Sequence, residues 1–252
     1  MRFIGIIPAR YASTRFPGKP LALIGSKPMI QRVYEQASKA LTELWVATDD
    51  VRIAECVRSF GGNVVMTRSD HRCGTERCLE ALQIIAPEEQ VVVINIQGDE
   101  PFIQPEQINA VKQCFDDNET QIATLVKPFT ESDTLADLEN PNTPKVVTAP
   151  DGTALLFSRS VIPYLRGIDK SDWLKQHKHF RHIGMYAYRS DVLLQITQLP
   201  PTPMEQAESL EQLRWLENGY KIRVAQCNTM SIGIDTPDDL VKANEWIKQH
   251  NY

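Results

Sequence analysis

Short apolar runs alternate with amphipathic segments through the first half of the chain. Residues 3–9 are apolar on both faces, which is typical of a strand buried in a parallel sheet. Apolar positions at helical spacing follow from Met29 to Ala37. The pattern then repeats, with strands predicted at 44–47, 63–66 and 91–96 and helices at 51–60, 75–85 and 104–115. This alternation predicts an α/β fold with a mostly parallel central sheet and helices on both faces.

The pattern changes after about residue 121, where fewer helices separate the predicted strands. These strands are expected at 122–126, 145–148, 154–157, 183–188 and 222–225, with a polar stretch at 169–181. Helical spacing at 204–217 predicts one continuous helix, and a closing helix is expected at 237–249 with Thr236 as its N-cap. We therefore predict a single domain over 1–252. Its main part covers about 1–120 and 221–252, and a smaller β-rich lobe covers about 121–220.

Composition and charge narrow the class of protein. The chain has 252 residues, of which 42% are hydrophobic, so it can bury a core without disulfides or a structural metal. Its net charge is −5. Nucleic-acid-binding proteins usually need a surplus of positive charge, so we expect no nucleic-acid partner. A local basic pocket for a small polyphosphate remains compatible with this balance.

The N-terminal apolar run and the cysteines bear on the compartment. The run at 3–7 ends at Pro8 and is too short for the core of a signal peptide. No stretch reaches the roughly 18 apolar residues of a membrane span, so we expect no membrane insertion. The five cysteines are scattered and form no C-x-x-C pair, which is typical of reduced thiols. We therefore expect a cytoplasmic protein.

The loop at residues 8–20 follows the first predicted strand and carries an unusual charge. Ligands of open parallel sheets bind beyond the carboxyl ends of the strands, where this loop begins. Arg10, Arg15 and Lys19 would repel one another unless an anion lay between them, and Ser13 adds a hydroxyl donor. A triphosphate is such an anion. The loop matches neither the Walker A pattern nor G-x-G-x-x-G, so a solvated turn or another kind of phosphate motif remains an alternative.

Several short motifs, in this order, resemble the sugar nucleotidyltransferases and, within them, the 3-deoxy-manno-octulosonate cytidylyltransferases. The similarity covers nearly the whole chain. The motifs are Ile6–Arg10, Lys19–Leu21, Ala47–Asp50, Cys73–Arg77, Asn95–Pro101, Phe157–Arg159, His182–Gly184, Glu208–Arg214 and Gly233–Pro237. Cys73 is a departure, because relatives commonly have serine there, which puts a hydroxyl contact in doubt. The resemblance implies the Rossmann-like fold of nucleotide-diphospho-sugar transferases, with a β-rich lobe that binds substrate and dimerises.

The implied reaction joins CTP and 3-deoxy-manno-octulosonate (Kdo) to give CMP-Kdo and diphosphate for lipopolysaccharide synthesis. In the family, acids at the positions of Asp99 and Asp235 hold magnesium, so we expect Mg²⁺ as the cofactor. Asp99 follows a predicted apolar strand, and Asp235 precedes a predicted helix. Without the resemblance, Asp99 could equally be a turn residue and Asp235 an acid of the first helical turn.

The resemblance also implies individual contacts. The expected catalytic residues are Lys19, Asp99 and Asp235. CTP is expected to be bound by Arg10, Ser13, Arg15, Lys19, Arg77 and Gln97. The sugar acid is expected to contact Arg159, His182, Tyr186, Glu211 and Gln212. For Glu211 and Gln212 the alternative is a solvated helix face.

Other interpretations remain open at this level. His177, His179 and His182 lie close in sequence, but their spacing and the neighbouring cations do not favour a zinc site. A related enzyme acting on 8-amino-Kdo or a sialic acid could differ in a few pocket residues. A nucleotide-sugar-dependent glycosyltransferase and a non-catalytic nucleotide sensor are more distant alternatives. The resemblance implies a homodimer.

Overall fold

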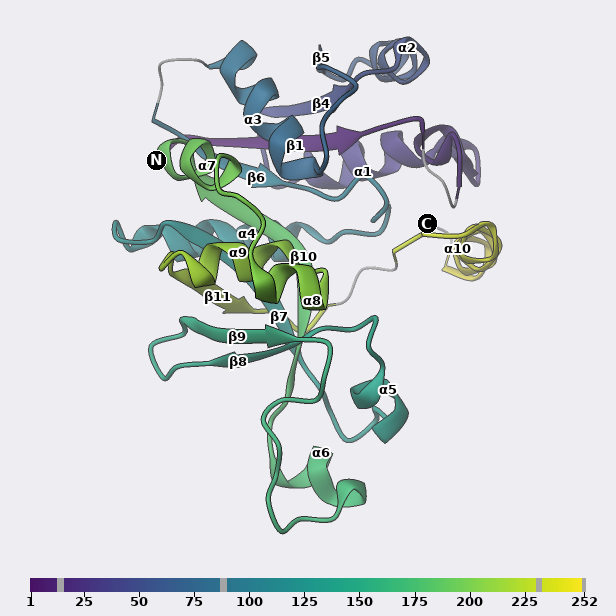
Figure 1. Ribbon diagram of the computed structural model, residues 1–252. Coiled ribbons are helices and arrows are strands. Elements are labelled where there is room, and N and C mark those ends of the chain that lie inside the picture. The colour runs from purple at the N-terminus through teal and green to yellow at the C-terminus, as the bar shows by residue number, and fades with distance from the viewer. Residues whose placement is uncertain (13–15, 87–89, 230–232, 251–252) are drawn as a thin grey trace. The chain divides into compact units, whose positions relative to one another are not determined.

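The computed structural model describes residues 1–12, 16–86, 90–229 and 233–250. The chain divides into two compact units, each built from segments that are distant in sequence (Figure 1). Unit 1 comprises Met1–Asn109, Ala187–Thr197 and Ser231–Tyr252, and unit 2 comprises Ala110–Tyr186 and Gln198–Met230. The sequence-based division at about residues 120 and 221 concerns substrate binding and stays a prediction.

Unit 1 contains a parallel sheet, as the alternating pattern predicts. Its strands are β1 (Phe3–Ala9), β4 (Leu44–Thr48), β5 (Val64–Met66) and β6 (Val92–Asn95), in the order β6-β1-β4-β5. Every pairing along this order is parallel, with Gly5 opposite Leu44 and Ile4 opposite Val93. Ile4, Ile6 and Ile7 have no exposed surface. The run is apolar throughout because both faces of β1 are covered.

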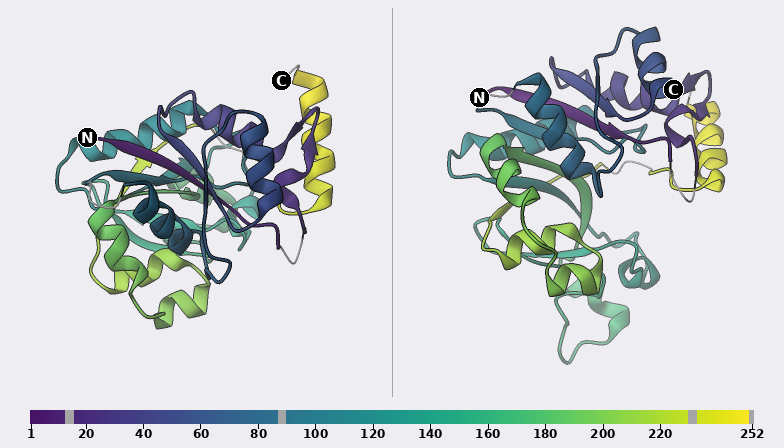
Figure 2. Two further views of the ribbon diagram at one scale, coloured as in Figure 1. Left: turned by 90° about the horizontal axis from the view of Figure 1, so that it is seen from above. Right: turned by 45° about the horizontal axis from the view of Figure 1, so that its top comes forward.

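Helices of unit 1 cover both faces of this sheet. They are α1 (Met29–Ala37), α2 (Val51–Ser59), α3 (Gly74–Ile85) and α7 (Ser190–Thr197), while α4 (Pro105–Gln113) continues from unit 1 into unit 2. The views of Figure 2 show α1 and α3 on opposite sides of β1. Right-handed crossovers require this, since the connection through α1 leads from β1 to β4 and the connection through α3 leads back to β6.

A short hairpin and the last helix complete unit 1. The hairpin of β2 (Leu23–Ile24) and β3 (Lys27–Pro28) follows the 3-10 helix η1 (Lys19–Leu21), and the closing helix is α10 (Pro237–His250). The Asn244 side chain accepts a hydrogen bond from the Gly25 amide at 2.8 Å. Figure 2 shows α10 in yellow beside the purple N-terminal segment. The hairpin has no clear sequence pattern, whereas α10 is confirmed.

Unit 2 is richer in β-structure, as expected for this part of the chain. Its strands are β7 (Ile122–Pro128), β8 (Lys145–Thr148), β9 (Ala154–Ser158), β10 (Phe180–Arg189, which enters unit 1 at Ala187) and β11 (Ile222–Gln226). β11 pairs with β7 in parallel, while β8 pairs antiparallel with β9 and β10. The helical elements are η2 (Cys114–Asp116), α5 (Leu135–Glu139), η3 (Lys170–Asp172), α6 (Trp173–Gln176), α8 (Pro203–Glu208) and α9 (Glu211–Glu217). The sequence pattern did not predict α5, α6 or the α7 helix of unit 1.

The prediction of one continuous helix over 204–217 is wrong. The segment forms α8 and α9, separated by Ser209 and Leu210, and the φ of Ser209, 51°, is in the left-handed region. The guanidinium of Arg159 donates to the carbonyls of Glu208 and Ser209, which compensates those groups for lost helical hydrogen bonds. Leu210 and Leu213, on either side of the start of α9, are both buried, so the apolar spacing in the sequence continues across the break.

Candidate functional site

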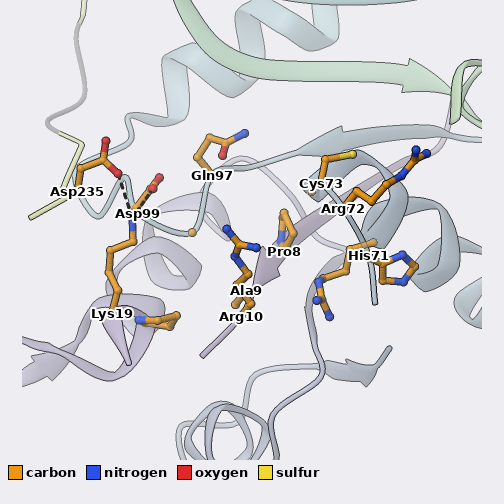
Figure 3. A pocket seen from close by; sticks show the side chains of 14 residues that line it. Pro8, Ala9, Arg10, Lys19, His71, Arg72, Cys73, Gln97, Asp99 and Asp235 are labelled. Atoms are coloured by element: carbon orange, nitrogen blue, oxygen red, sulfur yellow. Dashed lines mark hydrogen bonds and ion pairs between the residues drawn. The ribbon is translucent and has the colours of Figure 1, made fainter. Parts of the chain in front are cut away.

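A pocket lies at the carboxyl ends of β1 and β6 and beside the start of α3 (Figure 3). All of its lining residues belong to unit 1: Pro8, Ala9, Arg10, Lys19, Pro20, His71, Arg72, Cys73, Gly74, Arg77, Gln97, Gly98, Asp99 and Asp235. Parallel strands place the loops that follow them at one edge of the sheet, which is why segments far apart in sequence meet here.

Lys19 lies between two carboxylates at one end of the pocket. Its Nζ is 2.7 Å from Asp99 Oδ2 and 3.3 Å from Asp235 Oδ1, as the dashed lines of Figure 3 show. The Lys19 side chain is only 15% exposed. It leaves η1 just after Gly18, whose φ of 70° favours glycine and whose amide bonds to the Tyr11 carbonyl. The predicted convergence of the cationic loop with both aspartates is therefore present.

Three contacts place Asp235 in the pocket. The amide of the preceding residue, Ile234, donates to the Asp99 carbonyl at 2.9 Å. Ile234 is fully buried in a core cluster that includes Met29 and Phe102. Asp239 accepts hydrogen bonds from the amides of Asp235 and Thr236. Thr236 bonds in turn to the Asp239 amide at 3.2 Å, which confirms it as the N-cap.

The floor of the pocket consists of the ends of β1 and β6. Arg10 is exposed at the end of β1, and Gln97 lies half-buried beyond the end of β6. A Cβ atom at Gly98 would be 3.0 Å from the Pro8 carbonyl oxygen, so the two backbones approach more closely than a side chain permits. Ser13 and Arg15, two of the predicted phosphate contacts, lie outside the described residues.

Arg77 lines the pocket, but the residue is only 4% exposed, and its guanidinium contacts protein groups. Its Nη1 donates to Thr67 Oγ1 at 2.6 Å and to the Arg68 carbonyl at 3.2 Å. Its Nη2 is 3.2 Å from Asp49 Oδ1. The direct nucleotide contact that the resemblance implies for Arg77 stays a prediction. The contacts of its guanidinium indicate instead that it holds neighbouring segments of the protein in place.

The sequence analysis did not single out His71 and Arg72, which form part of the pocket wall. They lie in the loop between β5 and α3, together with Cys73. One signal was available, because this loop follows the carboxyl end of a predicted strand just as the loop at 8–20 does. The missing information was which side chains of the loop turn inward.

The predicted sugar-binding residues all lie in unit 2. His182 Nε2 is 2.9 Å from Thr124 Oγ1, and the His182 ring lies 5.3 Å from that of Tyr186. The Tyr186 ring in turn meets Trp215 of α9 edge-on at 5.0 Å. Desolvation lowers the pKa of His182 from 6.5 to about 3. Desolvation, with a smaller effect of Glu211, raises the pKa of Tyr186 well above 10.0. The ring of His182 is therefore neutral at physiological pH.

Gln212 and Arg159 are also held inside unit 2. Gln212 is 4% exposed, which excludes the solvated helix face that was its alternative. Its Nε2 is buried without a hydrogen-bond partner among the described residues. The Arg159 guanidinium donates to three carbonyls, those of Pro141, Glu208 and Ser209. This network ties the break between α8 and α9 to the segment before β8.

Two searches of the described residues bear on metals and membranes. Within residues 1–12, 16–86, 90–229 and 233–250, no group of three or more His, Cys, Asp and Glu side chains could hold a metal ion. The rings of His177 and His179 are 4.8 Å apart, but these histidines and His182 form no such group within these ranges. In the same ranges, no helix combines the length and the hydropathy that crossing a membrane requires.

Comparisons with known proteins agree in fold and in family. A family model described as cytidylyltransferase matches residues 4–222. The 3-deoxy-manno-octulosonate cytidylyltransferase of Bacteroides thetaiotaomicron is 61% identical over 251 residues, covering 100% of this chain and 100% of the relative. A solved structure of CMP:2-keto-3-deoxy-manno-octonic acid synthetase complexed with CTP is 42% identical, with a TM-score of 0.90 over 99% of this chain and 100% of its own.

A more distant structure supports the fold alone. A putative glucose-1-phosphate thymidylyltransferase from Bacillus anthracis is 18% identical, with a TM-score of 0.62 over 99% of this chain and 97% of its own. The expected fold class, a mostly parallel α/β sheet of the nucleotide-diphospho-sugar transferase type, is confirmed by these similarities.

Proposed function

Because this chain belongs to the cytidylyltransferase family, we propose that it transfers cytidylate from CTP to Kdo and releases diphosphate. The product, CMP-Kdo, is the activated sugar for lipopolysaccharide synthesis. The observation that carries the proposal is the meeting of Lys19 with Asp99 and Asp235 in a pocket that Arg10 also lines. A relative of the same name that is 61% identical supports the choice of substrates.

Mg²⁺ is the proposed cofactor, and the donor set of the pocket fits it. Asp99 and Asp235 both approach one positively charged atom, Lys19 Nζ, so both carboxylates can reach a single cation. The part of the chain that the structure describes offers no third acidic, His or Cys ligand in a metal-binding group with them. The other oxygens would come from substrate phosphates, as is usual for Mg²⁺. When bound, the ion would neutralise phosphate charge and polarise the α-phosphate.

Arg10 and Lys19, which line the pocket, are proposed to bind and orient the triphosphate. In the proposed reaction the 2-hydroxyl of the sugar attacks the α-phosphorus, and the bond to the diphosphate breaks in line with it. Such transfers depend on positioning and charge more than on covalent catalysis. Arg10 and Lys19 would stabilise the negative charge that develops on the departing diphosphate. Ser13 and Arg15 are proposed as further phosphate contacts, and Gln97 as a contact of the base.

The sugar acid is proposed to bind the polar groups of unit 2. Arg159 would pair with the carboxylate of the sugar, since a guanidinium matches the geometry of a carboxylate. Buried Gln212 Nε2 has no protein partner in the described chain and could donate to a sugar hydroxyl. His182, Tyr186 and Glu211 would complete the set. Because His182 is neutral, it would recognise hydroxyl groups and add no positive charge.

The proposed function also concerns the oligomeric state of the protein and its location in the cell. We infer a homodimer formed through the β-rich lobe at 121–220 and a cytoplasmic location, where CTP is available. No nucleic-acid partner is expected at a net charge of −5.

A substrate panel tests this function. Purified protein with Mg²⁺ is assayed for diphosphate release with CTP, UTP, ATP and GTP, each combined with Kdo, 8-amino-Kdo and a sialic acid. We expect rapid release only for CTP with Kdo. Preference for another sugar acid would reassign the substrate within the family. No release in any combination would favour a nucleotide sensor, and consumption of a nucleotide sugar would favour a glycosyltransferase.

A further inference from the structure

The loop at 67–73, between β5 and α3, forms the pocket wall opposite the two aspartates. Figure 3 shows His71, Arg72 and Cys73 on the side of the pocket away from Lys19, Asp99 and Asp235. We place the phosphates at the aspartate end, because Lys19 and the expected metal ligands lie there. The wall at 67–73 therefore faces the remainder of the nucleotide.

Arg77 holds the start of this loop. Its buried guanidinium donates to Thr67 Oγ1 at 2.6 Å and to the Arg68 carbonyl, and it pairs with Asp49 at 3.2 Å. Asp49 directly follows β4, and Thr67 directly follows β5. One planar side chain thus ties the ends of β4 and β5 to the start of the 67–73 loop. Neither Thr67 nor Asp49 lines the pocket.

Two carboxylates of α3 hold the rest of the loop. Glu76 accepts hydrogen bonds from the Arg72 amide at 2.8 Å and from Arg72 Nε at 2.7 Å. Glu80 accepts a hydrogen bond from the Arg68 amide at 3.0 Å, and it also contacts His71 Nε2. Arg77 lies between these carboxylates in sequence, so one helix fixes the whole loop.

The loop is also coupled to the pocket floor. A Cβ atom at Gly74 would be 3.2 Å from Pro8 Cγ, so the junction of the loop with α3 packs directly against the end of β1. A displacement of the loop would therefore reach Pro8 and Ala9, which line the pocket.

We propose that Arg77 is a positioning residue, which fixes the 67–73 loop as the wall against which the nucleoside of CTP binds, and that it does not contact the triphosphate. This role rests on the proposed function. Its guanidinium is committed to Thr67, Arg68 and Asp49, while Arg10 lines the same pocket and is exposed.

Nucleotide binding by variants of the supporting residues tests this role. Dissociation constants for CTP and CMP are measured by calorimetry for Thr67→Val, Asp49→Asn, Arg77→Met and the double variant Asp49→Asn/Arg77→Met. We expect Thr67→Val, which loses one buried hydrogen bond, to weaken the binding of CTP and of CMP by a similar factor, roughly fivefold. Asp49→Asn loses the charge of the ion pair and should also weaken both nucleotides, and Arg77→Met, which loses all of these contacts, should weaken both at least as much. The double variant should bind no more weakly than Arg77→Met, because the two side chains act as one unit.

Kinetics and thiol chemistry supply independent measurements. The KM for Kdo and kcat at saturating CTP should stay at the parent values in Thr67→Val and Asp49→Asn. Alkylation of Cys73 by iodoacetamide, followed by peptide mass spectrometry, should be faster in both, while Cys56 of α2 reacts as in the parent. Arg58→Met, at an exposed arginine of α2, is the matched control and should bind like the parent.

Two results would overturn the positioning role in a parent protein that binds CTP. One is a loss confined to CTP, with CMP binding unchanged in Arg77→Met, as a direct phosphate contact requires. The other is parent-like binding in both Thr67→Val and Asp49→Asn. A parent protein that binds no CTP would instead refute the proposed function itself.

Discussion

Single residues of the pocket have roles that depend on the charge of their neighbours. Lys19 lies between Asp99 and Asp235, so its ammonium offsets two carboxylates that would otherwise repel each other. Because the carboxylates also form the proposed metal site, removing one charge should affect the reaction more than the fold. In unit 2, by contrast, burial lowers the pKa of His182, so its ring carries no charge.

Replacement of Asp99 by asparagine should abolish most of the turnover. We expect kcat to fall roughly a hundredfold or more, because the variant loses a charged oxygen at the reacting phosphate. Diphosphate release at saturating CTP and Kdo measures this effect, and thermal unfolding checks the fold. Asp238→Asn is the control, because Asp238 is an exposed acid that does not line the pocket. Parent-like turnover in Asp99→Asn would remove Asp99 from the metal site.

The imidazole of His182 should stay neutral throughout the range in which enzymes of this kind are assayed. Burial lowers its pKa to about 3, whereas an unfolded chain binds the proton near 6.5. Stability from this residue is therefore complete above pH 6.5 and is lost as the pH falls towards 3. NMR of the ring protons, assigned with a His182→Asn variant, should show no titration between pH 8 and 4.5. A midpoint near 6.5 would mean that the ring is hydrated.

At the scale of elements, the ends of helices and strands place the chemical groups. The first turn of α10 sets the position of Asp235, because Asp239 binds the amides of Asp235 and Thr236. Gln212 is the second residue of α9, directly after the break from α8, and is buried in unit 2. At both places a functional side chain lies next to a helix end that side-chain hydrogen bonds hold.

Loss of the Asp239 carboxylate should change the pH dependence of stability. Hydrogen bonds from Thr236 hold the pKa of Asp239 below its ordinary value of 3.8. This contribution is present above that value and is lost as the pH falls through the lower, folded pKa. Urea unfolding at pH 7 and at pH 3 should therefore show a smaller loss of stability on acidification for Asp239→Asn than for the parent. Asp238→Asn should follow the parent curve, and an equal loss in Asp239→Asn would contradict the assignment.

At the scale of the molecule, the chain passes repeatedly between its two units. Unit 1 takes three segments and unit 2 takes two, so neither corresponds to one continuous stretch of sequence. The expected catalytic residues lie in unit 1 and the expected sugar contacts in unit 2. Large apolar side chains are exposed on the β-rich part of unit 2, including Leu155 and Tyr164. They are candidates for the proposed contact between two copies.

Light scattering should give twice the chain mass of 28.6 kDa. If the proposed dimer forms through the β-rich lobe, the variant Leu155→Lys/Tyr164→Lys should shift the mass towards the monomer, because charges would be buried without partners. Leu194→Lys, at an exposed leucine of α7 in unit 1, is the control and should leave the mass unchanged. A dimer that persists in the double variant would place the interface elsewhere.

The amino-acid sequence alone determined the main elements of unit 1 and the chemistry of its loops. Continuous apolar runs such as 3–9 predict strands covered on both faces, and β1 has the predicted bounds. Cations after one strand and an acid after another predict a ligand site, because parallel strands end at one edge of the sheet. Short elements such as the β2–β3 hairpin and α5 were missed, since few residues carry too little periodicity.

Only the tertiary structure decided which distant groups meet and which are buried. Lys19 and Asp235 are 216 residues apart, and packing of α10 on the N-terminal hairpin brings them together. The left-handed Ser209 and the buried guanidinium of Arg77 have no local signal either. Periodicity reports contacts within one element, whereas the partner of a charged side chain depends on how separate elements pack, and that is settled over the whole fold.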